Sequence, residues 1–398
     1  MTGGPADQEA WARHSAEWRD PAQIATQWEE ASSVDPRLLR YSVAGDWWGA
    51  LADANITLLV TREYEHLLMA LTVLEGKPRV TFMRMPHPSG IAVDALRGAV
   101  YVASTRNPNQ VYEFAPVATA LRRSDINHPE IEGHPLLPVG SSYYPGSLYI
   151  HDLALIAGRL HANAVGHNAV VRLDRGGRWE YVWWPRAIEK ADGPDFGRNY
   201  LQLNSIAPGR RLESSYFSAS ASTISSRRPG QLSFPVDGRG VIFSGQTREP
   251  IATGLTRPHS ARLHQRRLWV DNSGYGEVGL IAGEAFEAVA RLPGWTRGLC
   301  FAGDLAFVGT SKVIPRFVRY APGLDPDQTV CGIHAVDTQS GAVMGRITWP
   351  SGNQVFAVEA IPSSMSHGFP FAMGRRRTAK EKALFYVFRP DRARQERR

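Results

Sequence analysis

From about residue 56 onward, short apolar runs alternate with clusters of glycine, proline and small polar residues. The stretch HSARLHQRRLWVDNSGYGEVGLI, which begins at His259, shows the pattern: two apolar runs separated by a turn, the second ending in small polar residues. Apolar runs of this kind, bounded by turn-forming residues, are typical of β-strands. The 37 glycines and 27 prolines also favour many turns over long helices. The pattern predicts an all-β protein.

The arrangement of strand, turn and strand recurs along the chain. Its copies begin at Ser89, His151, Asn204, His259, Arg297 and, in a weaker sixth copy, near Asn353 or Phe356. The starts lie roughly 40 to 60 residues apart, which fits a four-stranded propeller blade with insertions in its loops. We therefore predict a β-propeller of six blades, with seven as the alternative.

The first residues differ from this repeat. Residues 1–44 carry several tryptophans among charged residues, at spacings compatible with amphipathic helix. A short helical N-terminal extension is therefore expected, followed by the propeller over residues 45–374.

The positive charge of the chain is confined to its last residues. Residues 375–398 contain ten Lys/Arg and three Asp/Glu, so this tail accounts for the whole net charge of +7. Within it, residues 383–390 have the aromatic and β-branched composition of a strand. Because the propeller body is neutral overall, the charge argues against nucleic acid as a partner and indicates a solvated basic tail.

Three further features bear on location. No apolar run approaches the roughly 20 residues that a membrane-spanning helix needs. The N-terminus lacks the basic and apolar regions of a signal peptide. The chain is too large to need a disulfide staple, so Cys300 and Cys331 are expected to be reduced, as in a cytoplasmic protein.

Polar residues stand at the start of the repeated first strand, where packing alone would favour Val or Ala. These are His151, Asn204, His259 and Arg297. In a propeller the first strand of each blade lines the central channel, and its first residues open onto one mouth. Since buried polar groups must find partners, their presence there indicates a functional site, and we predict His151, His259 and Arg297 as catalytic residues.

Two chemistries fit these residues. In the first, His151, His259 and Asn204 bind a divalent transition metal (Fe, Cu, Zn or Mn) that acts as a Lewis acid or redox centre. In the second, no metal is needed: one histidine is a general acid or base, and Arg297 or Lys312 stabilises a developing oxyanion.

The ends of the second strands are expected to form another ring of polar groups at the same mouth. The predicted substrate-binding residues there are Arg106, His167, Ser220, Tyr275 and Lys312. Small residues among them would leave room for a ligand. The GxSxG, Walker A, GxGxxG, HExxH and CxxC motifs are not found, so neither a serine nucleophile nor a nucleotide cofactor is expected.

Six motifs resemble, in order, those of a bacterial family of conserved proteins of unknown function. They are PHPSGIAVD, IHDLA, LNSIA, RPHSARLH, LPGWTRGLCF and AFVGTSK. The resemblance covers roughly residues 45–365 and implies a propeller, but it implies no reaction. The chain departs from the family at Gln202, where the family often has histidine. A site built from histidines would therefore contain fewer of them in this protein.

In plan, the chain is also similar to six-bladed propellers of the gluconolactonase, strictosidine-synthase and streptogramin-lyase kind. Those proteins use the channel mouth for hydrolysis, condensation or elimination, so the similarity implies chemistry at that place. The acidic metal ligands of gluconolactonases are not found at the corresponding positions, which argues against a lactonase.

The sequence therefore favours a cytoplasmic enzyme that acts on a small molecule or peptide at the channel mouth. Its reaction would be that of a lyase, an isomerase or cyclase, a hydrolase, or an oxidative tailoring enzyme. The alternative is a non-catalytic propeller that binds a ligand or another protein, with the two chain ends as docking elements. The sequence specifies no oligomeric state.

Overall fold

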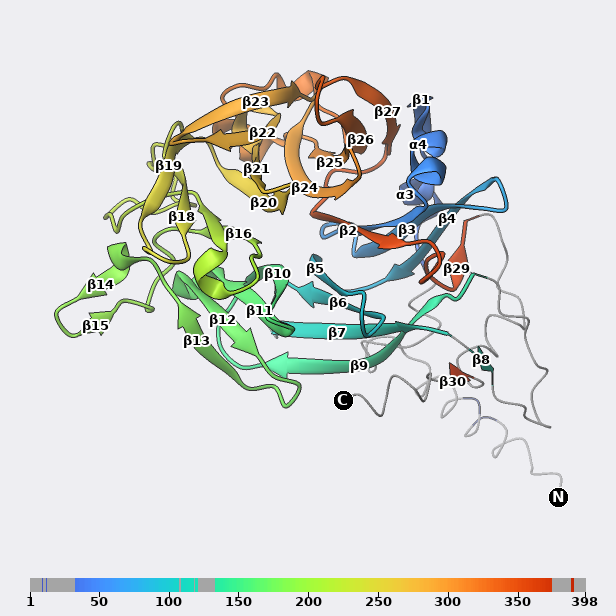
Figure 1. Cartoon of the computed structure of the whole chain (residues 1–398), viewed down its shortest axis with the longest axis horizontal. Helices are drawn as coiled ribbons and strands as arrows, with labels where there is room; N and C mark the ends of the chain where they lie inside the picture. The colour runs from blue at the N-terminus through green and yellow to red at the C-terminus, as the bar shows by residue number, and fades with distance from the viewer. Residues whose placement is uncertain are drawn as a thin grey trace.

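The computed structural model describes residues 9, 12, 33–106, 109–117, 119–120, 133–373 and 388–389. In this part of the chain, six sheets of four or five strands stand around a common axis as the blades of a β-propeller (Figure 1). The predicted all-β class and the six blades are thereby confirmed.

Four blades are built from consecutive segments, and in each the first strand lies at the channel and the last at the outer edge. The second blade contains β5 (Pro88–Asp94), β6 (Ala99–Ser104), β7 (Asn109–Pro116) and β9 (Leu136–Tyr144). The third contains β10 (Ile150–Ile156), β11 (Arg159–Ala164), β12 (Ala169–Leu173) and β13 (Trp179–Trp183). The fourth contains β16 (Leu203–Ala207), β17 (Tyr216–Ala219), β18 (Gly240–Ser244) and β19 (Pro250–Leu255). The fifth contains β20 (Pro258–His264), β21 (Arg267–Asn272), β22 (Glu277–Ala282) and β23 (Ala285–Arg291).

The first and sixth blades join distant parts of the chain. In the first blade, the innermost strand β28 (Ala357–Pro362) pairs with β2 (Ile56–Arg62), and β3 (Leu67–Leu74), β4 (Lys77–Arg84) and β29 (Phe371–Ala372) follow outward. The sixth blade contains β24 (Trp295–Ala302), β25 (Leu305–Ser311), β26 (Gly332–Asp337), β27 (Val343–Thr348) and, at its outer edge, β1 (Ser42–Gly45). The ring is thus closed by strands from both ends of the propeller.

A helical segment seals the joint between these two blades. After α3 (Pro36–Leu39), α4 (Trp47–Asp53) packs against β3 and β27. Trp47 is fully buried, with its ring edge-on to Phe307 of β25 at a centroid distance of 5.9 Å. Burial of such aromatic side chains stabilises the closed ring by about 2–3 kcal/mol each.

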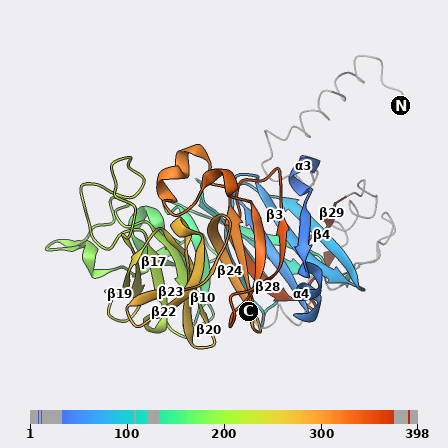
Figure 2. The same cartoon turned by 90° about the horizontal axis from the view of Figure 1, so that it is seen from above.

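The inner strands of neighbouring blades contact one another around the channel and all begin at the same mouth. The connection between β25 and β26, orange in Figure 2, forms the 3₁₀ turns η5 (Pro315–Tyr320) and η6 (Pro326–Gln328) on one face of the ring. The remaining short elements are η1 (Val165–His167), η2 (Arg186–Ile188), η3 (Leu212–Ser214), η4 (Ser273–Tyr275), β14 (Glu189–Lys190) and β15 (Gly193–Pro194).

The predicted chain ends lie largely outside the described residues. Of the helical extension expected over residues 1–44, the continuous description begins at residue 33. Of the tail expected over residues 375–398, only β30 (Phe388–Arg389) is described, paired with β8 (Thr119–Ala120). The domain boundaries therefore stay a prediction. Among the described residues, no helix has the length and apolar character needed to cross a membrane.

Candidate functional site

A cavity of about 250 Å³ opens at the mouth where the inner strands begin. The inner strands and the residues just before them contribute His151, His259, Trp295, Arg297 and Phe356 to its wall. The ends of the second strands contribute Thr105, Arg106, Ser311 and Lys312. The connection between β25 and β26 contributes Ile314, Phe317 and Tyr320 and covers part of the mouth.

Backbone geometry explains why these inner-strand residues face the cavity. The residue just before the inner strand has a positive φ of 43–54° at four successive blades, at His87, Tyr149, Gln202 and Arg257. Left-handed conformations of non-glycine residues cost about 1 kcal/mol or more each and are concentrated at functional sites. This turn brings the chain from the outer edge of one blade into the channel of the next.

The pairing register corrects one detail of the predicted repeat. In the fifth blade, His259 pairs with Asp271 before the register shifts, whereas in the sixth blade Thr296 pairs with Thr310 before the same shift. Thr296, not Arg297, therefore occupies the position of His259. Arg297 lies within the β-bulge that follows, and the bulge redirects its side chain into the same cavity.

Asn204 lies beneath the other predicted residues. It lines a much smaller hollow below the cavity, together with His151, His259 and Arg297. Its amide nitrogen donates hydrogen bonds to Ser220 Oγ (3.0 Å) and to the Pro258 carbonyl (2.9 Å). The predicted substrate-binding residue Ser220 is thus buried under the cavity, where it supports Asn204.

Two further predicted residues do not reach the cavity. His167 ends η1 and accepts or donates a hydrogen bond with Tyr181 (2.8 Å), while Tyr275 ends η4 and donates to Asp237 (3.0 Å). In both blades a 3₁₀ turn follows the second strand and carries these side chains away from the channel. Arg106 and Lys312, which follow their strands without such a turn, do line the cavity.

His259 is held as a neutral imidazole of defined tautomer. Its Nδ1 lies 2.8 Å from the Arg257 carbonyl oxygen and 3.0 Å from Ser273 Oγ, which itself donates to the Thr296 carbonyl. A carbonyl only accepts, so Nδ1 carries the proton and Nε2 has the lone pair. Burial, and then the charge of Arg297, lower the pKa of His259 well below its usual value of 6.5.

His151 is neutral for the same reasons. Burial lowers its pKa well below 6.5, and the charges of Arg297 and Arg106 add to this effect. Its ring meets Phe356 edge-on at a centroid distance of 5.6 Å, and its buried Nδ1 has no hydrogen-bond partner among the described residues. The site therefore presents two uncharged imidazoles.

Arg297 is the unusual group of the cavity. Its guanidinium carbon lies 3.3 Å from the centroid of the Phe356 ring. Burial lowers the pKa of Arg297 to about 10, and Glu63 is the first of several acidic groups that partly offset this effect. It stays charged at neutral pH, yet no hydrogen bond or ion pair to its guanidinium is found in the part of the chain that the structure describes.

The other cations around the cavity are already engaged. Arg106 Nε lies 3.3 Å from Glu63 Oε1, and Lys312 Nζ donates to the Pro350 carbonyl at 2.8 Å. Arg257 donates to Gln202 and stacks over the Tyr320 ring at 4.1 Å. Among the described cations of the wall, Arg297 is thus the one whose charged group makes no hydrogen bond or ion pair with another described residue.

The side chains of the site do not fit the predicted transition metal. Asn204 Oδ1 and His151 Nδ1 are buried without partners among the described residues, as free ligands would be. However, a divalent cation would lie beside the unpaired charge of Arg297, and Glu63, the carboxylate that lines this cavity, already contacts Arg106 and His87 through Oε1. The described part of the chain holds no group of three or more His, Cys, Asp or Glu side chains suited to a metal.

Asp152, the acidic residue of the small hollow below the cavity, already forms ion-pair contacts deeper in the channel. Asp152 forms an ion pair with Arg262 at 2.9 Å, and Arg262 also pairs with Glu359 at 3.3 Å. These three groups form a closed network deeper in the channel. Asp152 is therefore unavailable to the cavity above it.

Sequence reasoning missed several residues of the cavity wall. Glu63 and Tyr64 follow β2, which is the second strand of the first blade, but the inner strand of that blade comes from the other end of the chain. The strand repeat visible in the sequence begins at Ser89, after both residues. Phe317 and Tyr320 lie in the long connection between the second and third strands of the sixth blade, outside the repeated strands; the fourth blade has a similarly long connection at this place, over residues 220–239.

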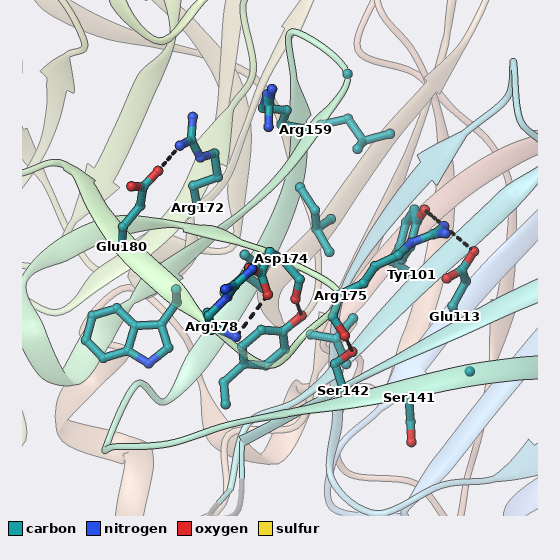
Figure 3. Close-up of a pocket in the computed structure, with 18 of the residues that line it drawn as sticks. Tyr101, Glu113, Ser141, Ser142, Arg159, Arg172, Asp174, Arg175, Arg178 and Glu180 are labelled. Atoms are coloured by element: carbon teal, nitrogen blue, oxygen red, sulfur yellow. Dashed lines mark hydrogen bonds and ion pairs between the residues drawn. The ribbon is translucent and has the colours of Figure 1, made fainter. Parts of the chain in front are cut away.

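A larger hollow of about 850 Å³, the outer groove, lies between the second and third blades and shares no wall residue with the cavity at the mouth (Figure 3). Its wall holds five arginines, and three of them are paired within the wall. Arg175 contacts Glu113 at 2.8 Å, Arg178 contacts Asp174 at 2.8 Å, and Arg172 pairs with Glu180. Because most of its arginines pair with carboxylates of the protein, this groove is a weaker candidate than the channel mouth.

The fold and the polar mouth define a six-bladed propeller with a pocket on its axis. Residues 45–368 match the family described as domain of unknown function DUF4915, and the chain belongs to this family. This agrees with the resemblance to a propeller family without an assigned function. No curated protein matches the sequence.

Solved structures share the architecture at low sequence identity. A chain of a nidogen/laminin complex aligns with a TM-score of 0.50 and 9% identity over 77% of this chain and 99% of its own length. A gluconolactonase from Xanthomonas campestris gives 0.44 and 14% over 75% and 86%, and a streptogramin B lyase gives 0.37 and 12% over 77% of each chain. Likeness at such identities concerns the fold alone.

Proposed function

We propose that this protein is an enzyme that binds a small organic anion at the channel mouth and moves protons on it through His259 and His151. The observation that carries the proposal is Arg297, a partly buried cation without a hydrogen bond or ion pair among the described residues, at the wall of a cavity. Leaving such a charge unpaired costs stability, so its retention is explained most simply by a ligand that pairs with it.

The contact between Phe356 and Arg297 restricts the direction from which a ligand could bind the guanidinium. Phe356 covers one face of the guanidinium, so the ligand's oxygens would meet its edge. Carboxylate and phosphate groups match that edge with two parallel hydrogen bonds. A cavity of about 250 Å³ suits a small molecule better than a folded partner.

Anion binding would also prepare the imidazoles for catalysis. In the free protein, the charge of Arg297 helps to keep the pKa of His259 and His151 low. A bound anion would offset that charge and raise both pKa values toward neutrality, where a general base is most effective. The lone pair on His259 Nε2 is the group we assign to proton abstraction.

Location in a reducing cytoplasm stays part of the proposal. Its support is that both cysteines, Cys300 and Cys331, are buried and free.

The test is ligand binding to Arg297 variants. Benzoate, 3-phenylpropionate and phenyl phosphate would be titrated by calorimetry at low and high salt against the unmodified protein and Arg297→Met. We expect binding that weakens with salt and is lost in Arg297→Met, while Arg267→Gln, an exposed arginine at the far end of β21, binds normally. Equal binding by Arg297→Met, or no binding of any anion, would contradict the proposal.

A further inference from the structure

We infer that the ligand of this cavity is a free α-amino acid with a large apolar side chain, its carboxylate bound by Arg297 and its ammonium by Glu63. This inference rests on the proposed function, because it takes the anion site at Arg297 as its starting point. It adds a second charged contact and the chemical class of the ligand.

Glu63 presents an unused oxygen to the cavity. The residue is 4% exposed and lines the same wall as Arg297. Its hydrogen bond and ion-pair contacts converge on Oε1: Thr105 Oγ1 at 3.2 Å, Arg106 Nε at 3.3 Å and His87 Nδ1 at 3.6 Å. In the described residues, Oε2 receives no hydrogen bond, and it is not among the buried unpaired atoms. It can therefore accept from a ligand.

Glu63 and Arg297 are close enough to interact but do not pair. Glu63 is the first of the acidic groups that act on the Arg297 charge, although no direct ion pair joins the two side chains. Two opposite charges held apart in one cavity would each gain from a ligand that carries both signs. A single anion would satisfy Arg297 and be repelled by Glu63, whereas an α-amino acid would satisfy both.

The rest of the wall indicates the side chain of that amino acid. Tyr64 stacks on Phe317 with ring centroids 6.4 Å apart and an interplanar angle of 12°. Tyr320 and Trp295 line the same cavity. Aromatic walls of this kind favour a large apolar or aromatic group over a small or charged one.

The experiment compares matched ligands by calorimetry on the full chain. Phenylalanine, tryptophan and leucine each carry both charges; 3-phenylpropionate lacks the ammonium of phenylalanine, and phenylalanine amide lacks its carboxylate. We expect at least one of the amino acids to bind about tenfold more tightly than its analogue with a single charge, because the second charge adds a charge-assisted hydrogen bond. Alanine should bind weakly, because it leaves the aromatic wall empty.

The variant Glu63→Gln isolates the second contact. It keeps the shape of the side chain and removes the charge, so the amino acid should lose about tenfold in affinity while 3-phenylpropionate binds as well as before or better. Glu249→Gln, an exposed glutamate in the turn between β18 and β19, is the matched control and should change neither affinity.

The outcomes separate this inference from the proposal on which it rests. If 3-phenylpropionate binds as tightly as phenylalanine to the unmodified protein, the zwitterion is excluded and the anion site remains. The zwitterion is also excluded if the Glu63→Gln variant still binds phenylalanine more tightly than 3-phenylpropionate by the same factor as the unmodified protein. If no carboxylate binds at all, both ideas fail.

Discussion

Two partly buried arginines of the same channel differ in how their charge is balanced. Arg262, on the fifth blade, contacts the carboxylates of Asp152 and Glu359, whose charges outweigh burial and raise its pKa. Arg297, on the sixth, has no such contact among the described residues, and burial lowers its pKa to about 10. A fully paired charge is part of the architecture, whereas an unpaired one in a cavity is available to a ligand.

The largest effect is expected from breaking the paired arginine. Arg262→Met would leave two carboxylates buried without their cation, which destabilises proteins by about 3–5 kcal/mol. Urea unfolding at pH 7 should therefore show a free energy of unfolding lower by that amount. A loss below about 1 kcal/mol would mean that the network is not structural.

Arg297→Met should have the opposite effect on stability. Removing a partly buried cation that has no partner among the described residues should leave the free energy of unfolding unchanged or raise it by up to about 2 kcal/mol. The same urea titration measures this, beside the loss of anion binding. A destabilisation as large as that of Arg262→Met would remove the distinction between the two arginines.

A smaller effect concerns the imidazoles beside Arg297. The pKa of His259 is lowered in the folded protein, so below pH 6.5 the unfolded chain takes up a proton that the folded one does not. Between pH 7 and 5.5 this histidine should therefore cost about 1 kcal/mol of stability. His259→Gln should lose about 1 kcal/mol less over that interval than the unmodified protein. An equal loss would mean that folding does not lower the pKa of His259, and the assignment of a buried neutral imidazole would be wrong.

The smallest effect is expected in the outer groove. The pair between Arg175 and Glu113 is exposed on the arginine side, so Arg175→Gln should change the free energy of unfolding by less than about 1 kcal/mol. Anion affinity at the channel mouth should not change. A marked loss of affinity in this variant would instead give the groove a role in binding.

The sequence predicted the blades and the location of the pocket because both depend on local patterns. Apolar runs set the strands, and His151 and His259 stand at the strand starts that open onto the channel. The contribution of Arg297 depends on a bulge, and a shift of one residue in a strand is not visible in an apolar pattern. Glu63 was missed because its blade is assembled from both ends of the chain.

That assembly has a consequence for how the protein is made. Tyr64, beside Glu63, donates its backbone N–H to Gln354, 290 positions later in the chain. Glu63 and Tyr64 are synthesised early, whereas Arg297 and Phe356 are synthesised near the end of the propeller. The pocket can therefore form only after almost the whole propeller has been synthesised. Only a propeller with a closed ring would then bind the ligand. A ligand present during folding would therefore stabilise the closed propeller relative to partly folded states in which the ring is open.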